Sequence, residues 1–150
     1  MTAKDYLMQL QTLDTKITQK VQEVAQLRSA VLGRGMQISD MKVQTSPQNS
    51  QEDMIAKYLD MESKINSMID KYVAEKDKII NQIHELADPK FIQILYDHYV
   101  PDENHRVKSL EQISVDMKYN YTYTCELHGQ ALLAFSKIIR TNQKIRTNPK

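Results

Sequence analysis

Apolar side chains recur at alternating steps of three and four along the first 32 residues, which places them on one face of a helix. Thr2 followed three residues later by Asp5 is a weak variant of the capping box that begins helices. The pattern therefore predicts one long helix over residues 1–32. We call the positions at these steps, which would face a partner helix, the seam positions. They are Ala3, Tyr6, Leu10, Leu13, Ile17, Lys20, Val24, Leu27 and Val31, with Lys20 as the one polar interruption.

Residues 48–88 repeat this spacing and predict a second long helix, whose seam positions are Met54, Tyr58, Met61, Ile65, Met68, Tyr72, Glu75, Ile79, Gln82 and Leu86. Further apolar residues beside these seam positions make the apolar face of the helix wider than a coiled-coil seam, which predicts contact with more than one partner. They are Ile55, Ile69, Val73, Ile80 and Ile83. The two seams suit an antiparallel hairpin within one chain or a coiled coil between chains. The sequence does not distinguish the two.

The segment between these helices, residues 33–50, reads GRGMQISDMKVQTSPQNS and is polar and rich in turn-forming residues. It is long for a hairpin loop, so we expect a mobile linker. The expected organisation is a helical hairpin or coiled coil over 1–87, a small helical domain over 88–140 and a basic flexible tail over 141–150.

Three shorter helices are expected after the second long one. Asp88 and Pro89 form an N-cap with Pro at the first helical position, and Ser109 can cap a helix over 110–117. After a three-residue connection, another helix is expected over 121–140. The helix that begins at Pro89 places several apolar residues on one face, namely Phe91, Ile92, Leu95 and Tyr99.

Two helices joined by about three residues are the arrangement of a helix-turn-helix. Ser114 is the small residue that lets the two helices approach closely. Lys118 stands where a left-handed turn favours Gly, at a cost of about 1 kcal/mol. An ordinary hairpin in a small bundle is the alternative. The expected core positions are Leu110, Ile113, Met117, Tyr119, Thr124 and Leu127.

Composition narrows the class of protein. Only 3 Gly and 4 Pro argue against a β-sandwich or barrel, so we expect an all-α fold. No apolar run is long enough to span a membrane, and a single Cys fits a reducing, cytoplasmic compartment. A net charge of +1 means that nucleic-acid binding would need a local basic patch, and the residues from Lys137 onward are basic without any acid.

Candidate reactive groups are few. Cys125 and His128 lie three residues apart, with His98 and His105 nearby in the sequence. A zinc site needs four convergent ligands, usually with a second Cys, so an exposed thiol and a packed imidazole are the favoured interpretation. There is no Gly-rich phosphate loop and no carboxylate pair placed for acid–base work. We therefore expect no enzyme activity, no metal and no cofactor.

Three segments carry a resemblance to a known family: MTAKDYLMQLQTLDTKI, MKVQTSPQNSQEDMIAKYLDMESKI and LEQISVDMKYNYTYTCELHGQALLAF. They are similar to small phage and mobile-element proteins of a domain-of-unknown-function family related to the late-gene transcription regulators of Gram-positive phages. Members end in a helix-turn-helix like region four of sigma factors. The resemblance covers nearly the whole chain and implies a helical fold and DNA binding near phage promoters, in the cytoplasm of a host cell.

The expected partner is therefore double-stranded DNA. The residues expected to contact it are Lys118, Asn120, Tyr121, Thr122, Cys125, Glu126, Gln130, Lys137 and Arg140. A homodimer formed through the N-terminal helices, and contact with host RNA polymerase or another host protein, are further expectations.

An alternative function follows from the charge of the last helix. Family members tend to carry basic residues where this chain has Thr122, Glu126 and Gln130. A phage accessory protein that does not bind DNA, and instead modulates a host protein such as a defence nuclease through its helical surface, is therefore the second hypothesis.

Overall fold

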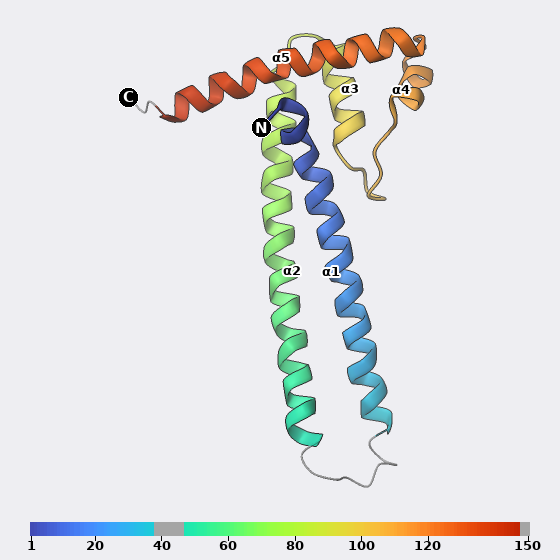
Figure 1. The fold of residues 1–150 in the computed structure, drawn as a ribbon, viewed down its shortest axis with the longest axis vertical. Helices are drawn as coiled ribbons and strands as arrows, with labels where there is room; N and C mark the ends of the chain where they lie inside the picture. Colours follow the sequence, from blue (N-terminus) through green and yellow to red (C-terminus); the bar gives the residue numbers. More distant parts are fainter. Residues whose placement is uncertain (38–46, 148–150) are drawn as a thin grey trace. The chain divides into compact units, whose positions relative to one another are not determined.

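The computed structural model describes residues 1–37 and 47–147, and within these ranges it contains five α-helices and no strand (Figure 1). The expected all-α class is confirmed. Across the described ranges, no helix combines the length and apolar character needed to cross a membrane. The helices are α1 (Ala3–Gln37), α2 (Pro47–His84), α3 (Pro89–Tyr99), α4 (Leu110–Met117) and α5 (Tyr121–Thr147).

Four helix ends differ from the expectation. α2 ends at His84 and not at residue 88, because the N–H groups of Glu85 and Leu86 bond to carbonyls three residues back in a tight turn. α1 continues through Gly33 and Gly35, because a Gly inside a helix costs only about 1 kcal/mol. α2 already begins at Pro47, since Pro is tolerated in the first turn of a helix. α5 runs seven residues beyond Arg140, so most of the expected tail over 141–150 is helical. The rest of the expected linker, 38–46, and residues 148–150 lie outside the described residues.

Side-chain caps begin three of the helices where the sequence predicts them. The Thr2 hydroxyl accepts a hydrogen bond from the backbone N–H of Asp5 at 3.1 Å, and the Asp5 carboxylate accepts one from the N–H of Thr2 at 3.2 Å. The Asp88 carboxylate accepts from the N–H of Lys90 at 2.9 Å. The Ser109 hydroxyl accepts from an N–H in the first turn of α4 at 3.2 Å. These bonds satisfy donors that a helix start leaves unpaired.

The chain divides into two compact units, and the division differs from the boundary expected at residues 87 and 88. The first unit comprises Met1–Asp14 and Tyr72–Lys150, and the second comprises Thr15–Lys71. The beginning of α1 and the end of α2 thus belong with the C-terminal helices. The reason is that both helix ends contribute side chains to the same core as α3 and α5.

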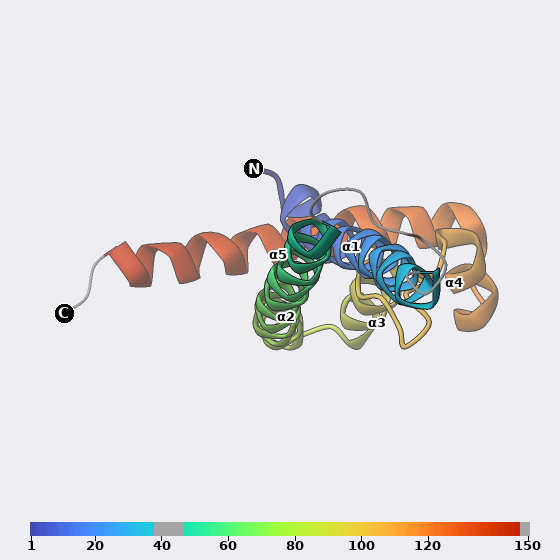
Figure 2. The same ribbon diagram turned by 90° about the horizontal axis from the view of Figure 1, so that it is seen from below.

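The core of the first unit joins residues far apart in the sequence. Figure 1 shows α5 crossing the beginning of α1, the end of α2 and α3. The Tyr6 hydroxyl donates a 2.7 Å hydrogen bond to Oε1 of Gln82, which ties α1 to α2 beside this core. In Figure 2 the last turns of α5 pass beyond the other helices of this unit. The core residues are Leu7, Leu10, Ile79, Ile83, Leu86, Leu95, Tyr99, Val100, Ala131 and Phe135.

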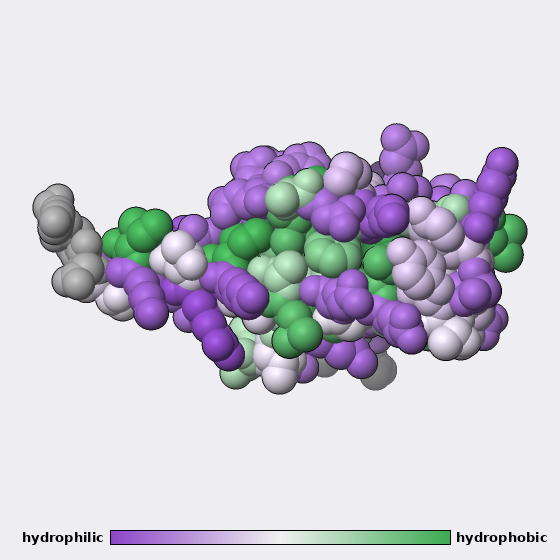
Figure 3. All heavy atoms as spheres, turned by 90° about the horizontal axis from the view of Figure 1, so that it is seen from above, coloured by the Kyte–Doolittle hydropathy of each residue, from purple (hydrophilic) through white to green (hydrophobic). Residues whose placement is uncertain are grey.

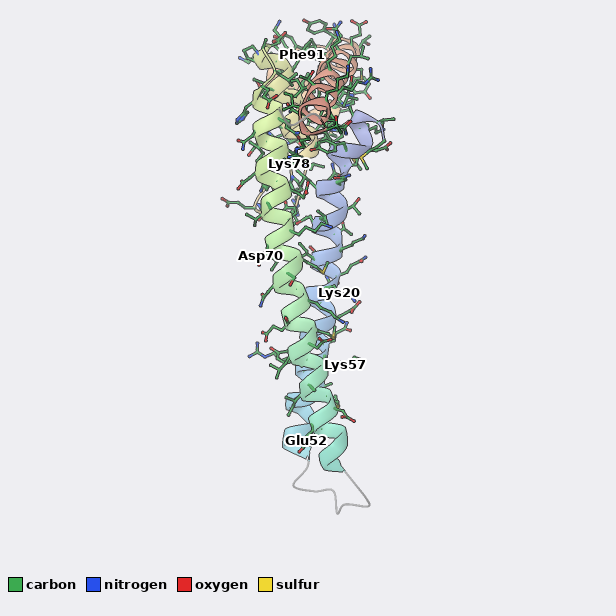
Figure 4. All side chains as sticks on the ribbon, turned by 90° about the vertical axis from the view of Figure 1, so that its left-hand side faces the viewer. Lys20, Glu52, Lys57, Asp70, Lys78 and Phe91 are labelled. Atoms are coloured by element: carbon green, nitrogen blue, oxygen red, sulfur yellow. The ribbon has the colours of Figure 1, made fainter. Side chains whose placement is uncertain are left out.

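The second unit consists of the remaining parts of α1 and α2, which run antiparallel and side by side (Figures 1 and 4). Ile65 is buried and the other apolar seam positions of this unit are half-buried, namely Ile17, Val24, Leu27, Val31, Met54, Tyr58, Met61 and Met68. The polar seam position, Lys20, is exposed and pairs with Glu23 at 3.1 Å. Lys57 and Asp70 are likewise exposed on α2 (Figure 4).

Candidate nucleic-acid interface

The short helix α4 is positioned by its cap and by one buried hydroxyl. Ser114 lies in the interior, and its hydroxyl donates a 2.6 Å hydrogen bond to the carbonyl of Glu111 in the preceding turn. A small side chain that satisfies its own hydroxyl can be buried at low cost. This agrees with the expected small residue at the crossing of α4 and α5.

The connection between α4 and α5 adopts the left-handed turn expected at Lys118. Its φ is 60° and its ψ is 38°, and its N–H donates to the carbonyls of Ser114 and Val115. The N–H of Tyr119 also donates to Ser114, at 3.0 Å. These bonds satisfy carbonyls at the end of α4, and the strain of a left-handed Lys is about 1 kcal/mol.

Asn120 begins α5 as its N-cap. Its side-chain oxygen accepts a hydrogen bond from the backbone N–H of Tyr123 at 2.7 Å, and its carbonyl accepts from the Thr124 hydroxyl at 3.0 Å. Asn120 was expected to contact DNA, but its amide oxygen already accepts the capping hydrogen bond. Its amide nitrogen and the second lone pair of its amide oxygen remain for another partner.

The crossing of α4 and α5 is buried in a small core shared with α3. Ile94 from α3, Ile113 from α4 and Leu127 from α5 form the buried centre, and Thr124 is also fully buried. The other expected core positions, Leu110, Met117 and Tyr119, are half-buried around this centre, together with Phe91.

Ile94 is the member of this core that sequence reasoning missed. Phe91, Ile92, Leu95 and Tyr99 were expected on one face of α3, and all four belong to the larger core of the first unit or pack against it. Ile94 turns instead toward α4 and α5, and Phe91 packs against both cores. A signal was present, because apolar residues on adjacent positions of a short helix indicate two buried faces.

The outward face of α5 carries most of the expected DNA-contacting residues. Lys118, Tyr121, Thr122, Glu126 and Gln130 are exposed, and Cys125 is half-buried. A side-chain hydrogen bond with Cys125 raises the pKa of Tyr121. Because Thr122 and Glu126 are four residues apart, they lie one turn apart on the same face.

The remaining two expected residues, Lys137 and Arg140, are also exposed but lie far along the helix. At 1.5 Å per residue they are roughly 22 and 27 Å beyond Thr122. The structure therefore does not bring them together with the residues at the beginning of α5.

Charge is distributed unevenly along this face. Residues 110–130 hold three carboxylates, Glu111, Asp116 and Glu126, against the ammonium group of Lys118. One carboxylate is neutralised, because Asp116 pairs with Lys108 at 3.0 Å. Residues 131–147 hold four basic residues and no acidic one. The face is thus acidic near the turn and basic toward the end of α5.

The histidines considered as metal ligands each have other partners. His128 is paired with the Tyr99 hydroxyl at 2.8 Å, and His105 with the Asp14 carboxylate at 2.7 Å. Nδ1 of His98 lies 2.8 Å from the carbonyl of Lys108. In the described part of the chain, no three His, Cys, Asp or Glu side chains converge as a metal site would require.

Comparisons of the chain with protein-family models, with curated proteins and with solved structures gave no match.

Proposed function

We propose that this protein is a DNA-binding transcription regulator of a phage or mobile element, in which α4 and α5 dock on double-stranded DNA as a helix-turn-helix. The observation that carries the proposal is the connection between the helices. A left-handed residue at Lys118 and a cap at Asn120 turn the chain sharply. Ile113 and Leu127 bury the crossing that results. A helix held this way presents its first turns to the major groove.

The exposed side chains at the beginning of α5 have the chemistry to read bases. Gln130 can bond to adenine, Glu126 can accept from cytosine N4, and Thr122 can bond to any base edge in reach. Lys118 supplies the cation of this region for a phosphate. Because this region carries little positive charge, affinity would depend on base contacts more than on electrostatic attraction to the phosphates.

A second candidate function is that of a protein-binding accessory factor. Two observations favour it. Asp116 is paired with Lys108, but Glu111 and Glu126 outnumber the single cation of Lys118 and leave the region around the turn acidic, which opposes approach to phosphates. Val115 on α4 is an apolar side chain that is 76% exposed beside the turn, and such residues are suited to protein contacts.

The deciding experiment selects bound sequences from a pool of random double-stranded DNA with the full chain. Enrichment of one sequence, with binding that weakens as salt increases, supports the regulator. Absence of any enriched sequence, with no binding at low salt, contradicts it and leaves the accessory factor as the better candidate.

Two substitutions test whether α5 faces the DNA. Thr122→Arg adds a phosphate contact and should steepen the log–log dependence of affinity on salt by about 0.9, and Glu126→Gln should tighten non-specific binding by removing a repulsive charge. Thr15→Arg is the matched control, because it adds the same charge at an exposed position of the second unit. If Thr122→Arg and Thr15→Arg behave alike, α5 does not face the DNA.

A further inference from the structure

A groove of about 470 Å³ lies in the first unit, between the beginning of α1 and the second half of α5. Its charged lining residues, Lys4 and Arg140, are both basic. Gly129 also lines it and borders open space, because a Cβ added there would meet nothing within 4 Å. Figure 3 shows apolar side chains gathered along the middle of the α5 face. The apolar lining residues of this α5 groove are Met1, Ala3, Leu132, Leu133 and Ile139.

The α5 groove is bordered by an exposed apolar side chain and by further cations, which suits an apolar surface flanked by carboxylates. Leu133 is 68% exposed, so its side chain lacks a covering partner within the first unit. Lys137 lies three residues before Arg140 and Lys144 four residues after it, so the three cations share one face of α5 and extend the positive charge along the helix. The nearby carboxylate of Asp5 is engaged by the Thr2 hydroxyl at 2.7 Å.

The second unit carries a surface with the opposite charge. Ile55, Leu59 and Ile69 on α2 are 45%, 57% and 39% exposed. Their spacing places them in one row along the helix, and we call this row the α2 stripe. Acidic residues flank it one turn away, with Glu52 three residues before Ile55 and Glu62 three residues after Leu59.

The basic residues of the same segment lie away from the α2 stripe. Lys57, Lys64 and Lys71 are spaced by seven. Lys57 and Lys71 each lie two residues from a residue of the α2 stripe, and Lys64 lies five residues from both Leu59 and Ile69. Residues two or five apart do not share a helix face. Lys64 pairs with Asp60 at 3.1 Å on that other face. The α2 stripe is therefore an apolar row with negative flanks.

We propose that the α5 groove of one copy of this chain receives the α2 stripe of a second copy, and that two such contacts close a reciprocal dimer. The occupant is a second copy because the chain itself supplies a complementary surface: an apolar row flanked by carboxylates fits an apolar groove rimmed by Lys4 and Arg140. Direct pairing of two α2 stripes would instead bring Glu52 and Glu62 of the copies toward like charges, which costs free energy.

Sedimentation of the full chain over a range of concentrations tests this contact. The expected result is a dimer whose dissociation constant rises about tenfold or more with Arg140→Glu or Glu62→Lys alone, since each places like charges across the contact. The two substitutions together restore an opposite-charge pair and should recover most of the affinity. Leu133→Ser and Leu59→Ser should also weaken the dimer.

Matched controls separate this contact from general effects. Lys64→Glu changes the charge of α2 on the other face, and Val115→Ser removes an exposed apolar side chain outside the groove, so neither should change the dissociation constant. Unchanged thermal unfolding of the test variants shows that they fold, as their exposed positions lead us to expect. Thr122→Arg should leave the dimer intact, so this test is independent of DNA binding.

Three results would overturn the proposal. A monomer at the highest concentration means that the groove and the stripe do not meet. A dimer that is insensitive to Arg140→Glu and Leu59→Ser means that another surface joins the copies. A double variant that is weaker than both single variants means that Arg140 and Glu62 do not face each other.

Discussion

The Tyr99 hydroxyl of α3 donates a hydrogen bond to Nε2 of His128 in α5 over 2.8 Å, and the two rings stack with centroids 5.7 Å apart. Burial raises the pKa of Tyr99 to about 12. Burial, then the neighbouring charges of His98 and Lys4, lower the pKa of His128 from 6.5 to about 4. Both groups are thus neutral at pH 7, and the hydroxyl donates to the unprotonated ring nitrogen.

Acidification should destabilise the protein through this pair. Because the pKa of His128 is lower in the folded state, its contribution is fully present above pH 6.5 and is lost as the pH falls toward 4. The loss amounts to at most roughly 3 kcal/mol. Urea unfolding at pH 7 and pH 4.5 measures it, with His128→Gln as the reference that cannot titrate. We expect the stability difference between the two proteins to change between these pH values in favour of His128→Gln, and a constant difference would exclude this role.

Lys118→Gly should stabilise the protein by about 1 kcal/mol. Lys118 adopts a φ of 60°, and Gly removes the contact between Cβ and the backbone that makes this conformation costly for other residues. Denaturant unfolding gives the free energy. Lys118→Ala is the control, since it removes the same charge and stem but keeps the Cβ. If Ala stabilises as much as Gly, the cause is not the backbone strain.

Leu127→Ala should cost roughly 2–5 kcal/mol, because it leaves a cavity between Ile94 and Ile113 in the small core. Leu133→Ala, one and a half turns further along α5, removes an exposed side chain and should stay within about 0.5 kcal/mol. Thermal or urea unfolding compares the two. Equal effects would mean that Leu127 is not buried in the folded protein.

Asn120→Ala should cost about 0.5–2 kcal/mol, because α5 loses its N-cap. Asn120→Ser keeps a capping oxygen and should lie within about 0.5 kcal/mol of the unmodified protein. Comparing the Ala and Ser variants also separates the role of Asn120 as a helix cap from a direct contact with DNA. A loss of affinity in both variants, at unchanged stability of the Ser variant, would indicate that the Asn120 amide contacts DNA.

Local signals predicted much of the fold. The heptad spacing predicted the seam that Ile65 and its neighbours form, and Thr2, Asp88 and Ser109 predicted where helices begin. These succeed because a cap or a helical row depends on residues within a few positions of one another. The left-handed turn at Lys118 was predictable for the same reason.

Relationships between distant elements were not predictable from one sequence. The bond between Tyr99 and His128 depends on how α3 meets α5, and neither residue carries a local sign of it. The inward turn of Ile94 follows from the same packing. The use of Asn120 as a cap is a local contact over three residues, and an Asn directly before a helix was a signal for it. In the candidate interface, exposure on α5 was predicted well, whereas the groove beside Arg140 required the position of α1.

The shared core of the first unit has a consequence for the order of folding during synthesis. The rings of Tyr6 and Phe135 lie 6.1 Å apart, and Leu7 and Leu10 are buried in the same cluster as Phe135. These N-terminal side chains leave the ribosome long before α5 exists to cover them. The core therefore closes late, over a long loop, and until then only residues of α2 and α3 can cover Leu7 and Leu10. Removing residues 1–14 should correspondingly leave Ile79, Leu95 and Phe135 uncovered in an otherwise complete chain.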